Sequence, residues 1–212
     1  MSIEVVSLDF AGVIAPKDFI DFFWFFVIPS RIASLERIAL YEAIKFVERE
    51  YWSTPANTLE WYLPSYWLKR FGLEAEEDEL IEEALAVAKP YGDALIAIPI
   101  LASRFRVVIA TNTPRKFVAK FLERYPQIGR HVSRVFSCLD DYAKPRKDRE
   151  FFLRVAEELG VEPKNVLHVG DDPVADYSEA LAAGLRALLM DRSARFAGRH
   201  LRNLYQLLEY LP

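Results

Sequence analysis

The chain has 212 residues, of which 52% are apolar and 27% are charged, and this globular composition excludes an intrinsically disordered protein. Its formal charge of -4 gives no general attraction to nucleic acid or anionic lipid, so we expect neither as a partner. The single cysteine, Cys138, cannot form an internal disulfide, and no apolar run approaches the roughly 18–20 residues of a membrane span. These features together predict a cytoplasmic protein.

Short apolar runs, rich in β-branched residues, alternate with helical patterns along most of the chain. The runs that resemble buried strands are residues 3–8, 105–110, 134–138, 165–169 and 185–190. Apolar residues at spacings of three and four predict helices over residues 92–104, 114–125, 148–159, 175–183 and 201–211. Strands that alternate with helices imply right-handed crossovers and a parallel sheet covered on both faces. We therefore predict an α/β fold with a Rossmann-like parallel-sheet core.

One long segment interrupts this alternation. Residues 16–89 show helical patterns rich in aromatic and acidic residues, and they contain no convincing strand. The segment is too long for a loop in a compact domain. We predict an all-helical cap over residues 16–89, inserted after the first strand into a core of residues 1–15 and 90–212. Its aromatic run, residues 19–26, exceeds one helical face, and exposed rings would be compatible with a homodimer.

Polar residues stand where four of the predicted strands end. In chain order these residues are Asp9, Thr111 with Asn112, Lys144, Asp171 with Asp172, and Asp176. Open parallel sheets bind ligands beyond the carboxyl ends of their strands, so we expect these groups to converge at one edge. Crowded carboxylates repel one another unless a cation joins them, and a hard divalent ion with oxygen ligands suits them. Mg²⁺ is the predicted cofactor.

The four motifs that carry these residues are LDFAGVI, VVIATNTP, YAKPRKD and VGDDPVAD. In order and spacing they resemble those of the haloacid dehalogenase-like hydrolase superfamily, and the resemblance covers residues 1–15 and about 90–212. It implies that Asp9 is the nucleophile of an aspartyl-enzyme intermediate. It also implies that Thr111 and Asn112 bind the substrate, and that Lys144 neutralises charge on Asp9 and on the phosphoryl group.

The same resemblance implies a set of metal ligands. Asp9 and Asp171 would bind Mg²⁺ directly, together with the backbone carbonyl of Ala11. Asp172 would be a further ligand, and Asp176 would bind the ion or orient its waters. The implied activity is Mg²⁺-dependent hydrolysis of a small phosphorylated or phosphonate compound.

Ala11 departs from the phosphatase pattern, which has a second aspartate there as general acid and base. Proton transfer by such a group typically contributes about 10²–10⁴-fold to the rate. An alanine here is similar to the phosphonoacetaldehyde hydrolase branch, in which a cap lysine forms a Schiff base. The cap lysines of this chain are Lys17, Lys45 and Lys69. The alternative function is a non-catalytic binding or interaction protein that keeps the fold.

Other residues near the motifs receive structural interpretations. His168 lies within a predicted strand, which favours a core or second-layer histidine over a catalytic base. Asp172 precedes Pro173, an arrangement typical of a helix N-cap followed by a first-turn proline. Arg146 and Lys147 are expected to belong to a solvated loop.

Overall fold

The computed structural model describes residues 3–55, 58–198 and 200–211, and the chain divides into two compact units. One unit consists of residues 1–16 and 89–212 and is called the core below. The other consists of residues 17–88 and is called the cap. Both boundaries lie one residue away from those expected from the sequence.

The core is built on a five-stranded parallel sheet with the strand order β3-β2-β1-β4-β5. Its strands are β1 Val5–Leu8, β2 Arg106–Thr111, β3 Arg134–Ser137, β4 Val166–Gly170 and β5 Arg186–Leu189. The three central strands are almost entirely buried, which explains why they read as continuous apolar runs. The predicted fold class, a Rossmann-like parallel sheet of the α/β type, is confirmed.

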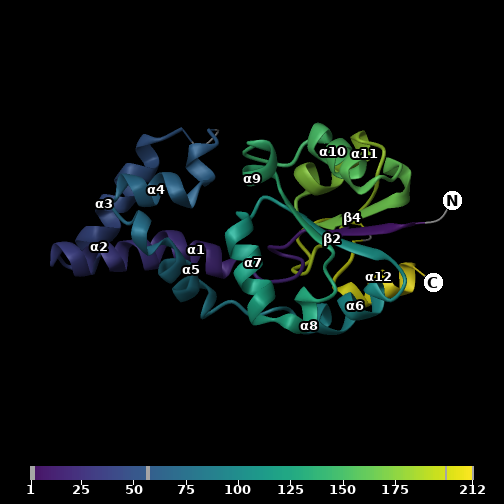
Figure 1. Cartoon of the computed structure of the whole chain (residues 1–212), viewed down its shortest axis with the longest axis horizontal. Helices are drawn as coiled ribbons and strands as arrows, with labels where there is room; N and C mark the ends of the chain where they lie inside the picture. Colours follow the sequence, from purple (N-terminus) through teal and green to yellow (C-terminus); the bar gives the residue numbers. More distant parts are fainter. Residues whose placement is uncertain (1–2, 56–57, 199, 212) are drawn as a thin grey trace. The chain divides into compact units, whose positions relative to one another are not determined.

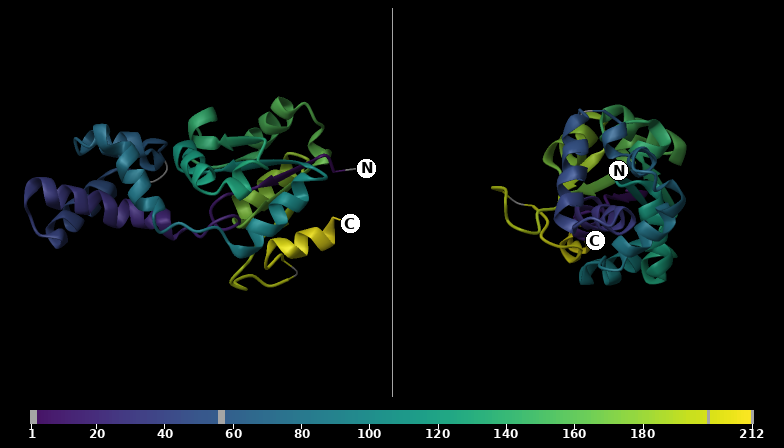
Figure 2. Two further views of the ribbon diagram at one scale, coloured as in Figure 1. Left: turned by 60° about the horizontal axis from the view of Figure 1, so that its bottom comes forward. Right: turned by 90° about the vertical axis from the view of Figure 1, so that its left-hand side faces the viewer.

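Helices cover both faces of this sheet (Figure 1). One face carries α10 (Arg149–Leu159) and α11 (Glu179–Ala182), and the other carries α6 (Gly92–Ala102), α8 (Pro126–Gly129) and α12 (Leu204–Tyr210). Helix α12 packs beside α6, as Figure 2 also shows. The remaining core elements are α7 (Arg115–Arg124), α9 (Cys138–Tyr142), the 3₁₀ turn η4 (Pro163–Asn165) and the π-helical turn η5 (Pro173–Ser178).

Side-chain caps explain where several core elements begin and end. The predicted last helix begins at Leu204 rather than at residue 201, because the Asn203 side chain accepts a hydrogen bond from the Gln206 N–H at 3.1 Å. Strand β3 ends at Ser137, whose hydroxyl accepts a hydrogen bond from the Asp140 N–H and caps α9. The helix predicted over residues 175–183 begins earlier, as η5, and continues as α11.

The strand order places β1 at the centre of the sheet. From β1 the chain first adds β2 and β3 on one side, and later adds β4 and β5 on the other. The direction of strand order therefore reverses between β1 and β4. In open α/β sheets the crevice at such a switch point, outside the carboxyl ends of the strands, is where ligands bind.

Among its described residues, the cap contains helices joined by short turns and no strand. Its α-helices are α1 Asp18–Phe22, α2 Ile28–Glu36, α3 Leu40–Ser53, α4 Pro64–Arg70 and α5 Glu77–Leu85. The π-helical turn η1 (Phe23–Val27) joins α1 to α2, and the 3₁₀ turns η2 (Glu60–Tyr62) and η3 (Glu74–Glu76) precede α4 and α5.

Aromatic rings fill the interior of the cap around Tyr51. The Tyr51 ring is buried, and its centroid lies 4.6 Å from that of Trp67, 5.6 Å from that of Trp61 and 5.8 Å from that of Trp24. The Tyr51 hydroxyl donates a hydrogen bond to the Trp24 carbonyl at 3.1 Å. With Trp52, whose exposed fraction is 79%, these residues account for all four tryptophans of the chain.

Candidate functional site

Three carboxylates and a lysine meet beyond the carboxyl ends of β1 and β4. Asp9 follows β1, Asp171 follows β4, and Asp176 lies in η5; all three are buried. One oxygen from each carboxylate lies within 4.8 Å of the others. The expected convergence of these three aspartates on one sheet edge is what the structure shows.

The lysine of this cluster is Lys147 and not Lys144. The Lys147 Nζ lies 3.0 Å from the Asp9 Oδ1 and forms an ion pair with the Asp176 Oδ1. Lys144 instead donates hydrogen bonds to Asp148 and Glu150, at 2.7 and 2.9 Å. Lys147, which is 2% exposed and does not belong to a solvated loop, therefore occupies the place beside Asp9 that was expected for Lys144. It directly precedes Asp148, the N-cap of α10, so the start of that helix fixes its position.

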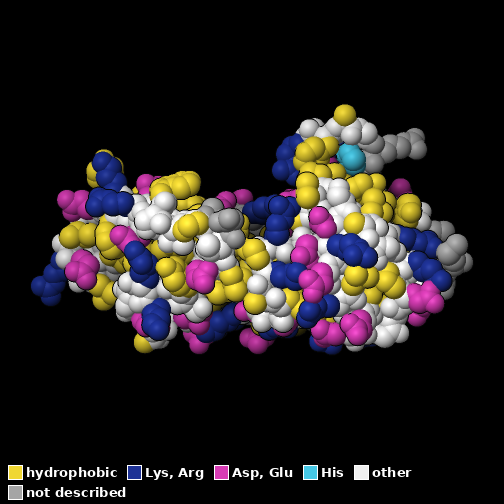
Figure 3. Space-filling view, turned by 90° about the horizontal axis from the view of Figure 1, so that it is seen from above, with side chains coloured by type: hydrophobic (Ala, Val, Ile, Leu, Met, Phe, Trp, Pro, Cys, Tyr) yellow, Lys and Arg dark blue, Asp and Glu magenta, His cyan; other side chains and the backbone are white. Residues whose placement is uncertain are grey.

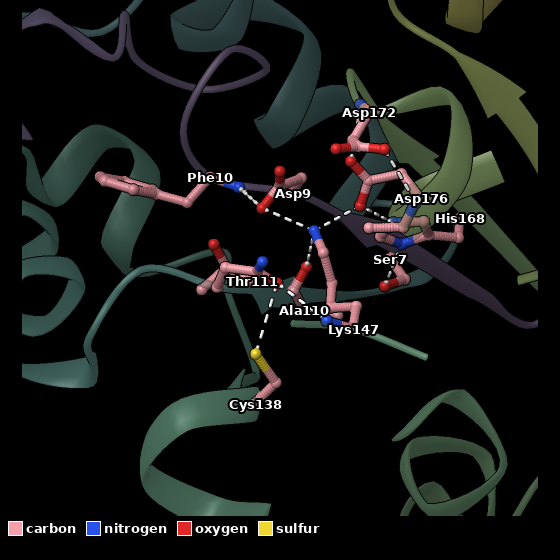
Figure 4. A network of polar contacts seen from close by, with 12 residues as sticks. Ser7, Asp9, Phe10, Ala110, Thr111, Cys138, Lys147, His168, Asp172 and Asp176 are labelled. Atoms are coloured by element: carbon pink, nitrogen blue, oxygen red, sulfur yellow. Dashed lines mark hydrogen bonds and ion pairs between the residues drawn. The ribbon is translucent and has the colours of Figure 1, made fainter. Parts of the chain in front are cut away.

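The Asp9 carboxylate lies in an environment that opposes its ionisation in the absence of a metal. Burial raises its pKa, the ammonium of Lys147 lowers it, and the neighbouring Asp176 and Asp171 raise it again. The Phe10 N–H donates a hydrogen bond to the Asp9 Oδ1 at 2.8 Å (Figure 4), and hydrogen bonding by the neighbouring Thr111 side chain lowers the pKa of this carboxyl group. Thr111 is thus beside Asp9, as expected.

Of Asp172 and Asp176, the structure brings only Asp176 into the carboxylate cluster. The exposed Asp172 side chain caps η5, because its Oδ1 accepts hydrogen bonds from the N–H groups of Val174 and Ala175, each at 2.8 Å. Its carboxylate is not part of the aspartate cluster. Asp176 points back toward β4, and its Oδ2 accepts a hydrogen bond from the Asp172 N–H at 2.9 Å. In this structure the Asp172 carboxylate therefore serves the N-cap of η5, and Asp176 is the residue of this pair that joins Asp9 and Asp171.

The backbone after Asp9 forms a tight turn against Asp171. Gly12 has a φ of 90°, and its N–H donates a hydrogen bond to the Ala15 carbonyl at 2.7 Å. A Cβ at Gly12 would lie 2.6 Å from the Asp171 Cγ, so only glycine fits both the conformation and the space. Ala11, the expected source of a carbonyl ligand, lies directly before this glycine and is 8% exposed.

Asn112 supports the lysine loop. Its Oδ1 accepts a hydrogen bond from the Lys147 N–H at 3.2 Å and another from the Cys138 thiol at 3.3 Å. These bonds fix the backbone from which the Lys147 side chain reaches Asp9. The Asn112 side-chain oxygen thus makes contacts within the protein, and the substrate contact expected for this residue stays a prediction.

The donor set fits a divalent cation. Asp9, Asp171 and Asp176 bring three carboxylates together, and Lys147 supplies one buried positive charge among them. A guanidinium of Arg195 approaches from the loop after β5, with its Nη2 3.7 Å from the Asp171 Oδ2, but its side chain is half-exposed. Carboxylate oxygens are the ligands that hard cations prefer. This buried cluster could hold a metal ion.

Several features of this site could not be predicted from the sequence. The pairing of Lys147 with two aspartates, the approach of Arg195 and a contact between His168 and Asp176 all depend on tertiary structure. For Lys147 a signal existed, because a lysine directly before an N-cap residue at this sheet edge has its backbone fixed.

Charged side chains of both signs are mixed on the face of the molecule that Figure 3 shows. In the view of Figure 3, lysine and arginine side chains are interspersed with aspartate and glutamate and form no continuous basic face. Across the described residues, every helix is too short or too polar to span a bilayer.

Sequence relatives of this chain are phosphate-releasing enzymes. The GMP/IMP nucleotidase YrfG of Escherichia coli is 24% identical over 191 residues, which cover 88% of this chain and 82% of the relative. N-acetylmuramic acid 6-phosphate phosphatase of Pseudomonas aeruginosa is 32% identical over 112 residues, which cover 51% of this chain and 47% of that protein.

Solved structures share the fold over nearly the whole chain. A haloacid dehalogenase-type phosphatase from Thermococcus onnurineus superposes with a TM-score of 0.81 at 21% identity, over 99% of this chain and 98% of that one. A 2-haloacid dehalogenase from Pseudomonas syringae gives a TM-score of 0.70 at 17% identity, over 99% and 98% of the two chains. The family model of haloacid dehalogenase-like hydrolases matches residues 3–184, and the chain therefore belongs to this family of hydrolases.

Proposed function

We propose that this protein is a Mg²⁺-dependent phosphatase of small phosphorylated compounds that works through an aspartyl-enzyme intermediate on Asp9. The observation that carries the proposal is the placement of Lys147, 3.0 Å from the Asp9 carboxylate in a buried cluster with two further aspartates. A buried ammonium beside a carboxylate reduces the repulsion that an incoming phosphoryl group would meet.

In the proposed first step, a carboxylate oxygen of Asp9 attacks phosphorus while the bond from phosphorus to the leaving-group oxygen breaks. The leaving group departs with the bonding electron pair, and the phosphoryl group stays on Asp9. Lys147 and the Thr111 hydroxyl, both beside Asp9, would stabilise the negative charge on the transferring oxygens. Water then attacks the phosphorus, which releases inorganic phosphate and restores the Asp9 carboxylate.

Mg²⁺ would be held by Asp9, Asp171 and the backbone carbonyl of Ala11, with Asp176 in a supporting position. Its contribution would be positive charge that offsets the charge of the transferring phosphoryl group. The residues of the chain fix the site around it. Gly12 in particular lets the Asp171 carboxylate lie directly against the turn that carries Ala11.

Ala11 determines which leaving groups this site would favour. A methyl side chain carries no proton, so the departing oxygen would leave largely unprotonated. The barrier would then rise with the basicity of the leaving group. We propose that aryl and acyl phosphates react much faster than alkyl phosphates.

The cap lysines favour the phosphatase over a phosphonate hydrolase. Lys17, Lys45 and Lys69 are all exposed, and Lys45 lies over the ring of Tyr41 at 4.3 Å. A lysine that forms a Schiff base needs a neutral amine, which burial or a neighbouring cation provides. None of these three lysines is buried.

The names of the relatives guide the choice of test substrates. Nucleoside monophosphates and sugar phosphates belong in the assay because YrfG is a GMP/IMP nucleotidase and the Pseudomonas aeruginosa relative acts on N-acetylmuramic acid 6-phosphate. Homodimer formation and a cytoplasmic location stay predictions from the sequence.

The test is phosphate release from aryl, acyl, sugar and nucleoside phosphates, with Mg²⁺ and with a chelator. We expect turnover that requires Mg²⁺ and falls as leaving-group basicity rises. Absence of turnover on every class, together with retained Mg²⁺ binding, would support the alternative of a non-catalytic binding protein.

A further inference from the structure

Five buried side chains form a continuous chain of polar contacts that runs from the candidate site to Ser7 (Figure 4). The Ser7 Oγ lies 2.9 Å from the His168 Nδ1, and the His168 Nε2 lies 3.0 Å from the Asp176 Oδ1. The same Asp176 oxygen pairs with Lys147, whose Nζ lies 3.0 Å from Asp9. The two ends of this chain of contacts lie close in sequence, because Ser7 is in β1 and Asp9 directly follows that strand.

The register between β1 and β4 positions the residues at the two ends of this chain of contacts. Ser7 on β1 pairs with His168 on β4, and the Asp9 N–H continues the same ladder by donating to the Val169 carbonyl at 2.8 Å. Residues two apart on a strand share a face of the sheet. The His168 ring is fully buried and packs against Phe152, with 4.8 Å between the ring centroids. The register and this packing leave the imidazole one orientation.

The direction of the hydrogen bonds follows from the charge of Asp176. The Asp176 Oδ1 forms an ion pair with the buried Lys147 ammonium, as a carboxylate does. An ionised carboxylate only accepts hydrogen bonds, so the His168 Nε2 must carry the proton that it shares with Asp176. The other ring nitrogen, Nδ1, shares a hydrogen bond with the Ser7 hydroxyl. Ser7 thereby holds the ring in the orientation that places Nε2 on Asp176.

Asp176 in turn determines where Lys147 lies. Besides its contacts to Lys147 and His168 through Oδ1, it accepts the Asp172 N–H through Oδ2 at 2.9 Å. A Cβ at Gly170 would collide with the Asp176 carboxyl, so this glycine allows its close approach to β4. The Lys147 Nζ has two further partners, the Asp9 carboxylate and the Ala110 carbonyl at 3.3 Å.

We propose that His168, oriented by Ser7, is a positioning residue for the phosphatase reaction, which holds Asp176 so that Lys147 stays on Asp9. The proposal rests on the proposed function and extends it to two residues that touch neither substrate nor metal. Without the donor at Nε2, the Asp176 carboxylate would gain a free acceptor and could turn toward Lys147 alone. The ammonium would then move away from Asp9, and its charge would be lost at the reacting carboxylate.

Two amide substitutions at His168 distinguish a role in positioning Asp176 from a role in filling the core. In His168→Gln the amide nitrogen lies the same number of bonds from Cα as the His168 Nε2, so the donor to Asp176 is kept. In His168→Asn the amide lies where the Nδ1 was, so the contact to Asp176 is lost. Both variants lose the ring that packs against Phe152, and we expect similar losses of stability.

We expect kcat to fall about 10–100-fold in His168→Asn and to stay within about threefold of wild type in His168→Gln. KM should change little in both variants, because position 168 does not touch the substrate. Equal kcat values in the two folded variants would overturn the proposal and leave His168 as a buried structural residue. If neither variant folds, Ser7→Ala decides: a fall of about three- to tenfold in kcat supports the proposal, and an unchanged kcat overturns it.

A binding measurement without turnover completes the test. Beryllium fluoride with Mg²⁺ mimics a phosphoryl group on a carboxylate, so its binding to Asp9 should raise the unfolding temperature by an amount set by the ratio of its concentration to Kd. We expect His168→Asn to need an about tenfold higher beryllium fluoride concentration than His168→Gln for the same rise. The same concentration for both would contradict the proposal. A wild-type protein without phosphatase activity would refute the proposed function, while this comparison would still test the role of His168.

Discussion

The core and the cap bury different kinds of side chain. Among the described residues, every buried aspartate, lysine and histidine side chain belongs to the core; they are Asp9, Asp93, Lys147, His168, Asp171, Asp176 and Asp191. The cap instead buries aromatic rings around Tyr51, whose hydroxyl donates to a backbone carbonyl. Buried charges are costly and persist only where they are paired. The difference indicates that the core carries the reactive groups, whereas the cap interior provides packing.

The largest effect should come from removing the proposed nucleophile. Asp9→Asn should lower turnover by at least about 10³-fold, because an amide cannot form the aspartyl intermediate. Asp172→Asn is the matched control, since an asparagine still caps η5 and its side chain lies outside the cluster. Steady-state phosphate release measures both. Substantial activity in Asp9→Asn would contradict covalent catalysis.

Two lysine variants compare the loss of a buried ion pair with the loss of an exposed one. Lys147→Met should lower kcat by at least about 10²-fold, because the reacting carboxylate loses its ammonium partner. It should also lower the free energy of unfolding by about 3–5 kcal/mol, because two buried carboxylates lose their partner. Lys144→Met should cost about 1 kcal/mol or less, since its partners are exposed acids. Denaturant unfolding and phosphate release measure these effects. Comparable losses in both variants would contradict the assignment of Lys147.

Adding a carboxylate to the core should raise activity on poor leaving groups. Ala11→Asp restores a proton donor two residues after Asp9 and should raise alkyl-phosphate turnover about 10–100-fold. The gain on aryl phosphates should be smaller, because their leaving groups depart without a proton. The measurement is the rate against leaving-group basicity for both proteins. The same slope in both would show that another group already supplies the proton.

A small change inside the cap should affect stability and spare the chemistry. Tyr51→Phe removes the hydroxyl that bonds the Trp24 carbonyl but keeps the ring, so it should cost about 0.5–1.5 kcal/mol. We expect kcat on a small aryl phosphate to stay within about twofold of wild type. Thermal unfolding and steady-state kinetics provide the two readouts. A large loss of kcat would show that the cap interior takes part in the reaction.

The smallest effect concerns acid stability of the core. Burial opposes ionisation of Asp191, but hydrogen bonds from the Phe196 and Arg195 N–H groups and from Arg202 lower its pKa to about 2. This depressed pKa adds stability that is present above the ordinary value of 3.8 and is lost as the pH falls toward 2. Asp191→Asn should therefore unfold with a weaker pH dependence between these values. Identical acid profiles would contradict this role of Asp191.

Periodicity and strand-end residues predicted the fold and most of the site. Asp9, Thr111 and Asp171 directly end or follow strands, so their positions depend only on the sheet being parallel. Lys147 and Asp176 lie farther from a strand, and their positions depend on a loop and on a π-helical turn. For Asp172 the sequence carried two signals, a metal motif and an N-cap before proline, and the side chain serves the N-cap.

The position of all four tryptophans in the cap also has an optical consequence. Excitation at the red edge of protein absorbance would report on the cap alone, and Trp24, Trp61 and Trp67 would sense its interior through the rings that surround them. The core contains no tryptophan, so it would not contribute to the fluorescence at these wavelengths. Fluorescence and far-UV circular dichroism, recorded on one sample during unfolding, would therefore distinguish loss of the cap from loss of the sheet without any added label.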